Sequence, residues 1–138
     1  TIQDGNVTLS AMTDRDVNTQ QEGKAPQPNA LLFPSRHLDS YMKNLHENVK
    51  EFARSLQMQN GTMFIQAFVK GDEFIVFEMG YRLCGANEYV IVSKENEINT
   101  LDMYIQMALT GKFQGWDNTK YDNPYFKNKY CILIPLLK

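Results

Sequence analysis

The sequence has little of what marks membrane, secreted or nucleic-acid-binding proteins. No apolar run approaches the roughly 20 residues that a membrane helix needs, and the first residues lack the basic and then apolar layout of a signal peptide. The net charge of −2 gives no electrostatic basis for a nucleic-acid surface, which is usually basic. We therefore expect a cytoplasmic protein that binds neither nucleic acid nor a membrane.

Cysteine and histidine are also scarce. Cys84 and Cys131 lie far apart without a metal-type spacing, so buried, reduced thiols are favoured over a disulfide or a zinc site. His37 falls at the start of a predicted helix and His46 lies beside its apolar stripe. That placement favours boundary or solvated histidines over general bases.

The length and composition suit one globular domain. With 138 residues, 43% of them hydrophobic, the chain can bury a single core and is not a disordered tail. We expect residues 1–138 to form one incomplete domain. The chain opens on a turn between two strand-like pieces and closes on an apolar strand, residues 130–137, that has no sequel.

The N-terminal quarter predicts a hairpin and then a loop. A Gly-Asn pair separates residues 1–4 from an alternating run at 7–13, a pattern typical of two paired strands. Residues 14–35 are polar and contain three prolines, which predicts a long surface loop. Its charged residues Arg15 and Asp16 are expected either to be solvated or to line a substrate pocket.

The middle of the chain predicts a helix followed by a hairpin. Apolar residues recur every three or four positions over 38–56, which indicates one long amphipathic helix ending at Gly61. Residues 62–70 and 73–80 are rich in β-branched and aromatic side chains and flank a turn. Residues 87–97 suit either a strand or a helix, and the helix is favoured.

The last third predicts one more helix and a closing strand. Asn99 or Thr100 can cap a helix that ends at Gly111, and residues 112–128 are irregular. The strand at 130–137 is expected to join the same sheet as the central hairpin. The mixed order of elements favours an α+β fold, with a mainly antiparallel sheet and flanking helices.

The loop length of the central hairpin decides which side chains share a face. A two-residue loop places Gln66 and Glu78 on opposite faces, whereas a three-residue loop pairs them. We choose the three-residue loop because it gathers apolar side chains on one buried face. Burial of apolar surface stabilises a fold by about 25 cal/mol per Å². That face is predicted to be Ile65, Ala67, Val69, Ile75, Phe77 and Met79; the other face is predicted to be Phe64, Gln66, Phe68, Val76, Glu78 and Gly80.

The paired Gln66 and Glu78 can serve one cation. Directly opposed strand residues have Cβ atoms about 4.5 to 5.5 Å apart, and Mg²⁺ is typically held by one or two carboxylates together with water and nucleotide phosphates. Arg82, four residues after Glu78, can turn toward the same phosphates. The plainer interpretation also stays open: Glu78 and Arg82 form a simple ion pair, and Gln66 bonds to nearby backbone.

Two segments of the hairpin resemble a known family. Residues 61–68 (GTMFIQAF) and 73–82 (EFIVFEMGYR) are similar to the end of the ATP-grasp fold, and the glutamine is similar to that of the carbamoyl-phosphate synthase large subunit. The resemblance implies the C-terminal half of an ATP-grasp domain that uses ATP and Mg²⁺, or Mn²⁺ in its place. It also implies Gln66 and Glu78 as metal ligands, Glu78 and Arg82 as nucleotide-binding residues, and Arg82 as the catalytic residue that steadies the transferred phosphoryl group.

The resemblance implies a part of an ATP-dependent ligase of the carboxylate-amine or carbamoyl-phosphate synthase type. Its partners would be ATP, a small carboxylate and N-terminal subdomains that hold the family's lysine and glycine-rich loop, so this piece alone is expected to be inactive. Gly80 departs from the pattern, because the family has an asparagine ligand there. The alternatives are a non-catalytic binding or regulatory module with a degenerate site, and a structural domain.

Overall fold

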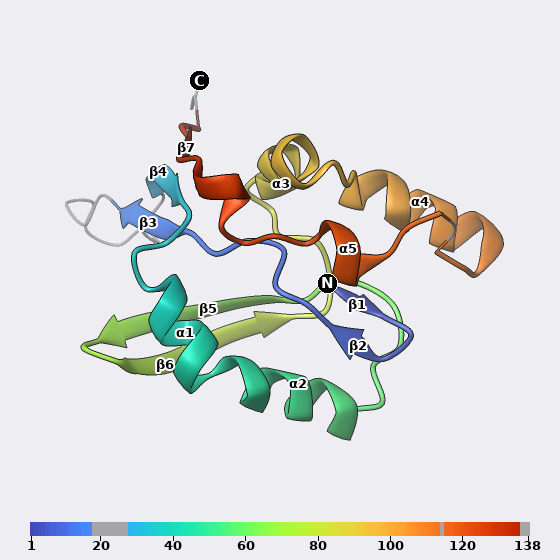
Figure 1. Ribbon diagram of the computed structural model, residues 1–138, viewed down its shortest axis with the longest axis horizontal. Coiled ribbons are helices and arrows are strands. Elements are labelled where there is room, and N and C mark those ends of the chain that lie inside the picture. Colours follow the sequence, from blue (N-terminus) through green and yellow to red (C-terminus); the bar gives the residue numbers. More distant parts are fainter. Residues whose placement is uncertain (18–27, 114, 136–138) are drawn as a thin grey trace, which may run out of the picture.

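The computed structural model describes residues 1–17, 28–113 and 115–135. It confirms the predicted α+β class, with small antiparallel sheets flanked by helices (Figure 1). The described strands form three separate sheets instead of the single sheet that we expected. No helix in this part of the chain combines the length and the apolar character needed to cross a membrane.

The first hairpin is shorter than predicted. Strand β1 (Ile2–Gln3) pairs with β2 (Asn6–Val7), and the strand expected over residues 7–13 ends at once. Polar groups after Val7 bond to distant segments instead: the Thr8 hydroxyl donates to Asp122 at 2.5 Å. Tertiary hydrogen bonds therefore override the alternating pattern.

The predicted loop at residues 14–35 contains two strands. Strand β3 (Asp14–Val17) pairs with β4 (Pro28–Phe33), and β4 also pairs with β7 (Cys131–Leu133), all antiparallel. The prediction was wrong because the apolar end of β4 outweighs Pro28 and Pro34: Pro28 is the first residue of the strand and Pro34 follows its last residue, so neither interrupts the middle of the ladder. The closing strand thus joins β4 and not the central hairpin, and residues 18–27, including Pro26, lie outside the described part.

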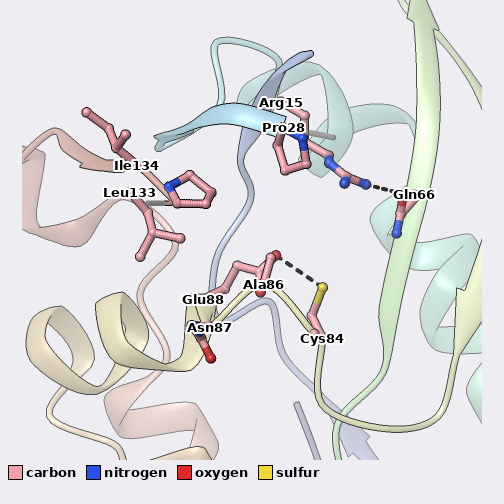
Figure 2. A pocket seen from close by; sticks show the side chains of 11 residues that line it. Arg15, Pro28, Gln66, Cys84, Ala86, Asn87, Glu88, Leu133 and Ile134 are labelled. Atoms are coloured by element: carbon pink, nitrogen blue, oxygen red, sulfur yellow. Dashed lines mark hydrogen bonds between the residues drawn. The ribbon is translucent and has the colours of Figure 1, made fainter. Parts of the chain in front are cut away.

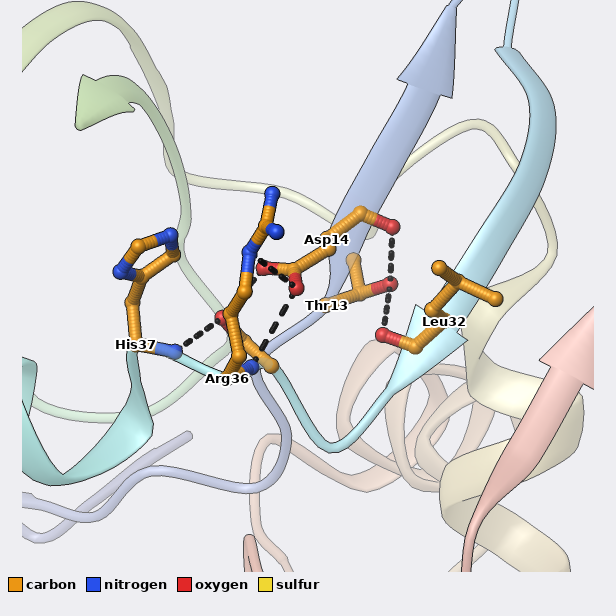
Figure 3. Close-up of polar contacts among 6 residues, drawn as sticks. Thr13, Asp14, Leu32, Arg36 and His37 are labelled. Carbon is orange, nitrogen blue, oxygen red and sulfur yellow. Dashed lines mark hydrogen bonds and ion pairs between the residues drawn. The ribbon is translucent and has the colours of Figure 1, made fainter.

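Buried side chains of this sheet contribute to one of two hydrophobic core clusters among the described residues. Leu31 and Phe33 of β4 pack with Phe126, with the two phenylalanine rings stacked 5.9 Å apart. Residues that follow β4 contact the first residue of β3. The Asp14 carboxylate accepts a hydrogen bond from the Ser35 hydroxyl at 2.5 Å, and its Oδ2 lies 3.4 Å from the Arg36 Nε (Figure 3). These contacts fix the start of β3.

The predicted long helix is bent. Helix α1 (Leu38–Asn44) and helix α2 (His46–Ser55) meet at Leu45, whose φ of −126° leaves the helical region. The bend lets α1 reach the central hairpin, while α2 packs on the first hairpin through Ala53 (Figure 1). A helical repeat in sequence reports neither the bend nor the end at Ser55.

Helices follow the central hairpin, which is β5 (Phe64–Lys70) and β6 (Glu73–Gly80). As predicted, α3 spans Glu88–Asn96, and α4 spans Thr100–Thr110 with Asn99 capping its first turn and Gly111 in a left-handed conformation after it. The region predicted to be irregular also holds short helices, α5 (Asn118–Tyr121) and the 3₁₀ segment η1 (Phe126–Asn128).

Candidate functional site

The central hairpin brings Gln66 and Glu78 together by a route that we did not predict. Its turn has two residues, because Lys70 pairs with Glu73, so the three-residue loop was wrong. Gln66 nevertheless opposes Glu78, since the register shifts between Gln66 and Ala67. One extra residue in β6, Phe77, forms a β-bulge at that point and restores the pairing.

The same bulge changes which hydrophobic side chains share a face with Gln66. Ile75 opposes Phe68, and the Phe77 ring stacks on Phe68 with centroids 4.6 Å apart. Ile75 and Phe77 therefore lie on the face of Gln66, while Val76 opposes Ala67 on the other face, which reverses three of our assignments. We call the Gln66 side the outer face; its exposed apolar side chains are Phe68 (65%), Ile75 (54%) and Phe77 (53%).

Arg82 also lies on the outer face. Its guanidinium carbon sits 4.6 Å from the centre of the Phe64 ring. Phe64 opposes Gly80 in the ladder, two pairs beyond Gln66 and Glu78 and therefore on the same face. Among the described ion pairs there is none between Arg82 and Glu78. The simple ion-pair interpretation is therefore not what the structure shows.

Gly80 is required by the ring above it. A Cβ added at Gly80 would come 2.2 Å from the Phe64 ring, closer than atoms can pack. The Phe64 ring thus fills the space into which a side chain at this position would project. By the resemblance described above, the family has an asparagine metal ligand at this position, and the Phe64 ring leaves no space for one.

Arg15 reaches the outer face from a different sheet. It lies in β3, not in a loop as predicted, and its guanidinium donates a short hydrogen bond to the Gln66 side-chain oxygen. Asp16, the next residue, is exposed. Arg15 borders a hollow of about 610 Å³ beside Gln66, and Asp16 does not line it; that this hollow takes a substrate stays a prediction.

This pocket lies between β3 and β4, the start of α3, and the end of β7 with the residues that follow it (Figure 2). At its floor the Cys84 thiol donates to a Glu88 carboxylate oxygen at 3.1 Å. Burial and the nearby Glu88 raise the pKa of the Cys84 thiol, so it is a protonated donor and not a nucleophile. Both cysteines are free and half-buried, which confirms reduced thiols but not full burial.

The two histidines take the places expected of them. His37 precedes α1, and His46 begins α2, with its ring 5.6 Å from that of Tyr41. Burial lowers the pKa of His46, which keeps the imidazole neutral. Neither histidine lines the pocket beside Gln66.

The oxygen donors of the outer face fit Mg²⁺ in part. Glu78 is an exposed carboxylate, and Gln66 adds an amide oxygen that already accepts from Arg15. Within the described ranges no three His, Cys, Asp or Glu side chains group around one point. One carboxylate and one amide are the smallest number of protein ligands that Mg²⁺ usually has when phosphates supply further ligands.

In comparisons with known proteins, no family model, curated protein or solved structure matches this chain.

Proposed function

We propose that this chain forms the Mg²⁺- and phosphate-binding side of the ATP site in an ATP-dependent ligase, as the C-terminal half of an ATP-grasp domain. The supporting observation is that Gln66, Glu78 and Arg82 share the outer face of one hairpin. Gln66 and Glu78 are the metal ligands in this proposal. Glu78 and Arg82 contact the phosphates.

The charges of the outer face suit a polyphosphate. Two guanidinium groups lie near the Gln66 and Glu78 pair, since Arg15 bonds to Gln66 and Arg82 lies over Phe64, while Lys70 and Glu73 pair with each other at the turn end of the same face. Guanidinium forks bind phosphate oxygens through paired N–H donors. Bound Mg²⁺ would supply Lewis-acid neutralisation of the phosphate charge. Arg82 would hold the transferred group, because its planar head is fixed against Phe64.

The stacked Phe68 and Phe77 rings offer a surface for the base of the nucleotide. Both side chains are more than half exposed and lie next to the Gln66 and Glu78 pair. Stacking of a base on an aromatic side chain contributes about 1–3 kcal/mol. A nucleotide on the outer face can thus place its base on these rings and its phosphates toward Arg82.

In the intact ligase, the resemblance implies that a substrate carboxylate oxygen attacks the γ-phosphorus of ATP. The new O–P bond gives an acyl phosphate, the bond to ADP breaks, and an amine then displaces phosphate. Arg82 would offset the negative charge that develops during the first step.

A second candidate function is a degenerate binding module. The Phe64 ring over Gly80 favours it, because the ring leaves no space for the asparagine ligand that the resemblance implies.

Calorimetric titration of ATP, with Mg²⁺ and with a chelator, separates these two candidates. For the ligase we expect Mg²⁺-dependent binding that weakens at least about tenfold in Glu78→Gln, since hydrogen bonds to charged groups contribute about 1.5–3 kcal/mol. Glu73→Gln is the matched control, an exposed glutamate of the same strand. Equal affinities in the two variants would remove the metal role of Glu78, and binding that ignores Mg²⁺ would favour the degenerate module.

A further inference from the structure

The pocket beside Gln66 has walls of opposite charge. Arg15 projects from β3 on one wall, and Glu88 projects from the start of α3 on the facing wall, with the hollow between them (Figure 2). Leu133, Ile134 and Pro135 line a third side and make it apolar. A small molecule that matches these walls has a negative group, a positive group and an apolar part.

The cationic wall suits a carboxylate. A guanidinium has five N–H donors in a planar fork, and the Arg15 bond to Gln66 uses one of them. That bond also fixes the direction of the side chain and holds it at the edge of the outer face. A carboxylate bound by Arg15 would therefore lie next to the oxygen of Gln66.

The anionic wall suits an ammonium group. One oxygen of Glu88 accepts from Cys84, and the other is shielded from solvent and has no hydrogen-bond partner among the described residues. A shielded oxygen without a donor costs free energy. A cationic donor in the hollow would satisfy this oxygen.

We infer that this pocket binds an α-amino acid with a branched apolar side chain. Arg15 holds its carboxylate, Glu88 holds its ammonium, and Leu133 and Ile134 contact its side chain. The role of this ligand as the carboxylate substrate rests on the proposed ligase function, because Arg15 places the carboxylate beside Gln66. The binding itself needs neither ATP nor Mg²⁺.

Three ligands with the same branched side chain test this inference by calorimetry. They are L-leucine, 4-methylpentanoate, which lacks the amine, and 3-methylbutylamine, which lacks the carboxylate. We expect leucine to bind at least about tenfold more tightly than either analogue, because each lost charged contact is equivalent to about 1.5 kcal/mol or more. Arg15→Gln should remove the preference over 3-methylbutylamine. Glu88→Gln, which keeps an acceptor for Cys84, should remove the preference over 4-methylpentanoate.

Arg54→Gln and Glu51→Gln are the matched controls, since both residues are exposed on α2, and they should change none of the affinities. Circular dichroism confirms that each variant is folded. A folded protein that binds no leucine, or binds 4-methylpentanoate equally well, overturns the inference. Leucine binding with these preferences but without Mg²⁺-dependent ATP binding supports the pocket and sinks only the ligase proposal.

Discussion

At the scale of single residues, Gly80 has the tightest constraint on the outer face. The Phe64 ring lies where a side chain at Gly80 would project, and the Arg82 guanidinium carbon lies 4.6 Å from the centre of the same ring. Any side chain at this position must push the ring away. Gly80 is therefore coupled to Arg82 through Phe64, although the three residues are not neighbours in sequence.

Gly80→Ala should lower the free energy of unfolding by about 1–3 kcal/mol, the usual cost of overpacking. In a Phe64→Ala background the same change should cost much less, because the ring that meets the new methyl group is gone. Urea denaturation of the four proteins measures this coupling. Equal costs in the two backgrounds would show that the ring does not constrain Gly80.

Part of the site could be predicted from residues alone. Gln66 and Glu78 were paired by choosing the loop length that gathered apolar side chains on one face; the pair was right, but the β-bulge at Phe77 produces it and not the loop length. Arg15 could not be assigned a contact with Gln66, because the two lie 51 residues apart and on different sheets. Phe64 carried no signal beyond its hydrophobicity, since its role depends on the glycine across the ladder.

At the scale of elements, the β-bulge of β6 determines which side chains lie on the outer face. It turns both Phe77 and Glu78 toward the side of Gln66, so an aromatic pair and a carboxylate lie together. Simple alternation of side chains along the strand predicted Phe77 on the opposite face. A bulge adds one residue without a sequence marker, which is why the turn length was wrong while the Gln66 and Glu78 pair was right.

Phe77→Ala should weaken ATP binding by about fivefold or more, since base stacking is worth about 1–3 kcal/mol. Binding of inorganic tripolyphosphate should not change, because it has no base. Parallel calorimetric titrations compare the two ligands, and Val90→Ala, an exposed apolar residue on α3, serves as the control. An equal loss for both ligands would argue against a base on the rings.

Helix α1 gives a pH-dependent prediction. Burial raises the pKa of Tyr41 from 10.0 to about 12, and the side chain is 8% exposed. The folded state thus prefers the neutral phenol, so its contribution to stability is intact below pH 10 and is lost as the pH rises toward 12. One pKa unit corresponds to about 1.4 kcal/mol, which gives a loss of about 2–3 kcal/mol.

Urea unfolding between pH 8 and pH 12 checks this loss, with Tyr41→Phe lacking it and Tyr130→Phe, at an 86% exposed position, retaining it. The same pH dependence in wild type and Tyr41→Phe would contradict the assignment.

Among the elements, α4 was predicted well because the Asn99 cap and the left-handed Gly111 mark its ends locally. Helix α3 has no side-chain cap at its start and ends at the left-handed Glu97, so its sequence also suited a strand. The bend at Leu45 was missed because it serves contacts with two different hairpins.

At the scale of the whole molecule, the candidate site lies where separate sheets meet. The sheet of β3, β4 and β7 supplies Arg15, and the two-stranded central hairpin supplies Gln66, Glu78 and Arg82. A two-stranded hairpin is marginally stable by itself, so its contacts with α1 and with Arg15 help to position the outer face. The α+β class could be predicted from element order, but the division into three sheets could not, because strand partners are set by long-range packing.

Paramagnetic broadening by Mn²⁺·ATP in the amide NMR spectrum locates the nucleotide on the protein, with Mg²⁺·ATP as the diamagnetic reference. If the hairpin binds Mg·ATP, the amide signals of Gln66, Glu78 and Arg82 broaden first and Leu109 at the far end of α4 keeps its intensity. Glu78→Gln loses the effect, and Glu73→Gln retains it. Broadening centred on another part of the molecule, or none in the folded protein, would contradict a Mg·ATP site on this hairpin.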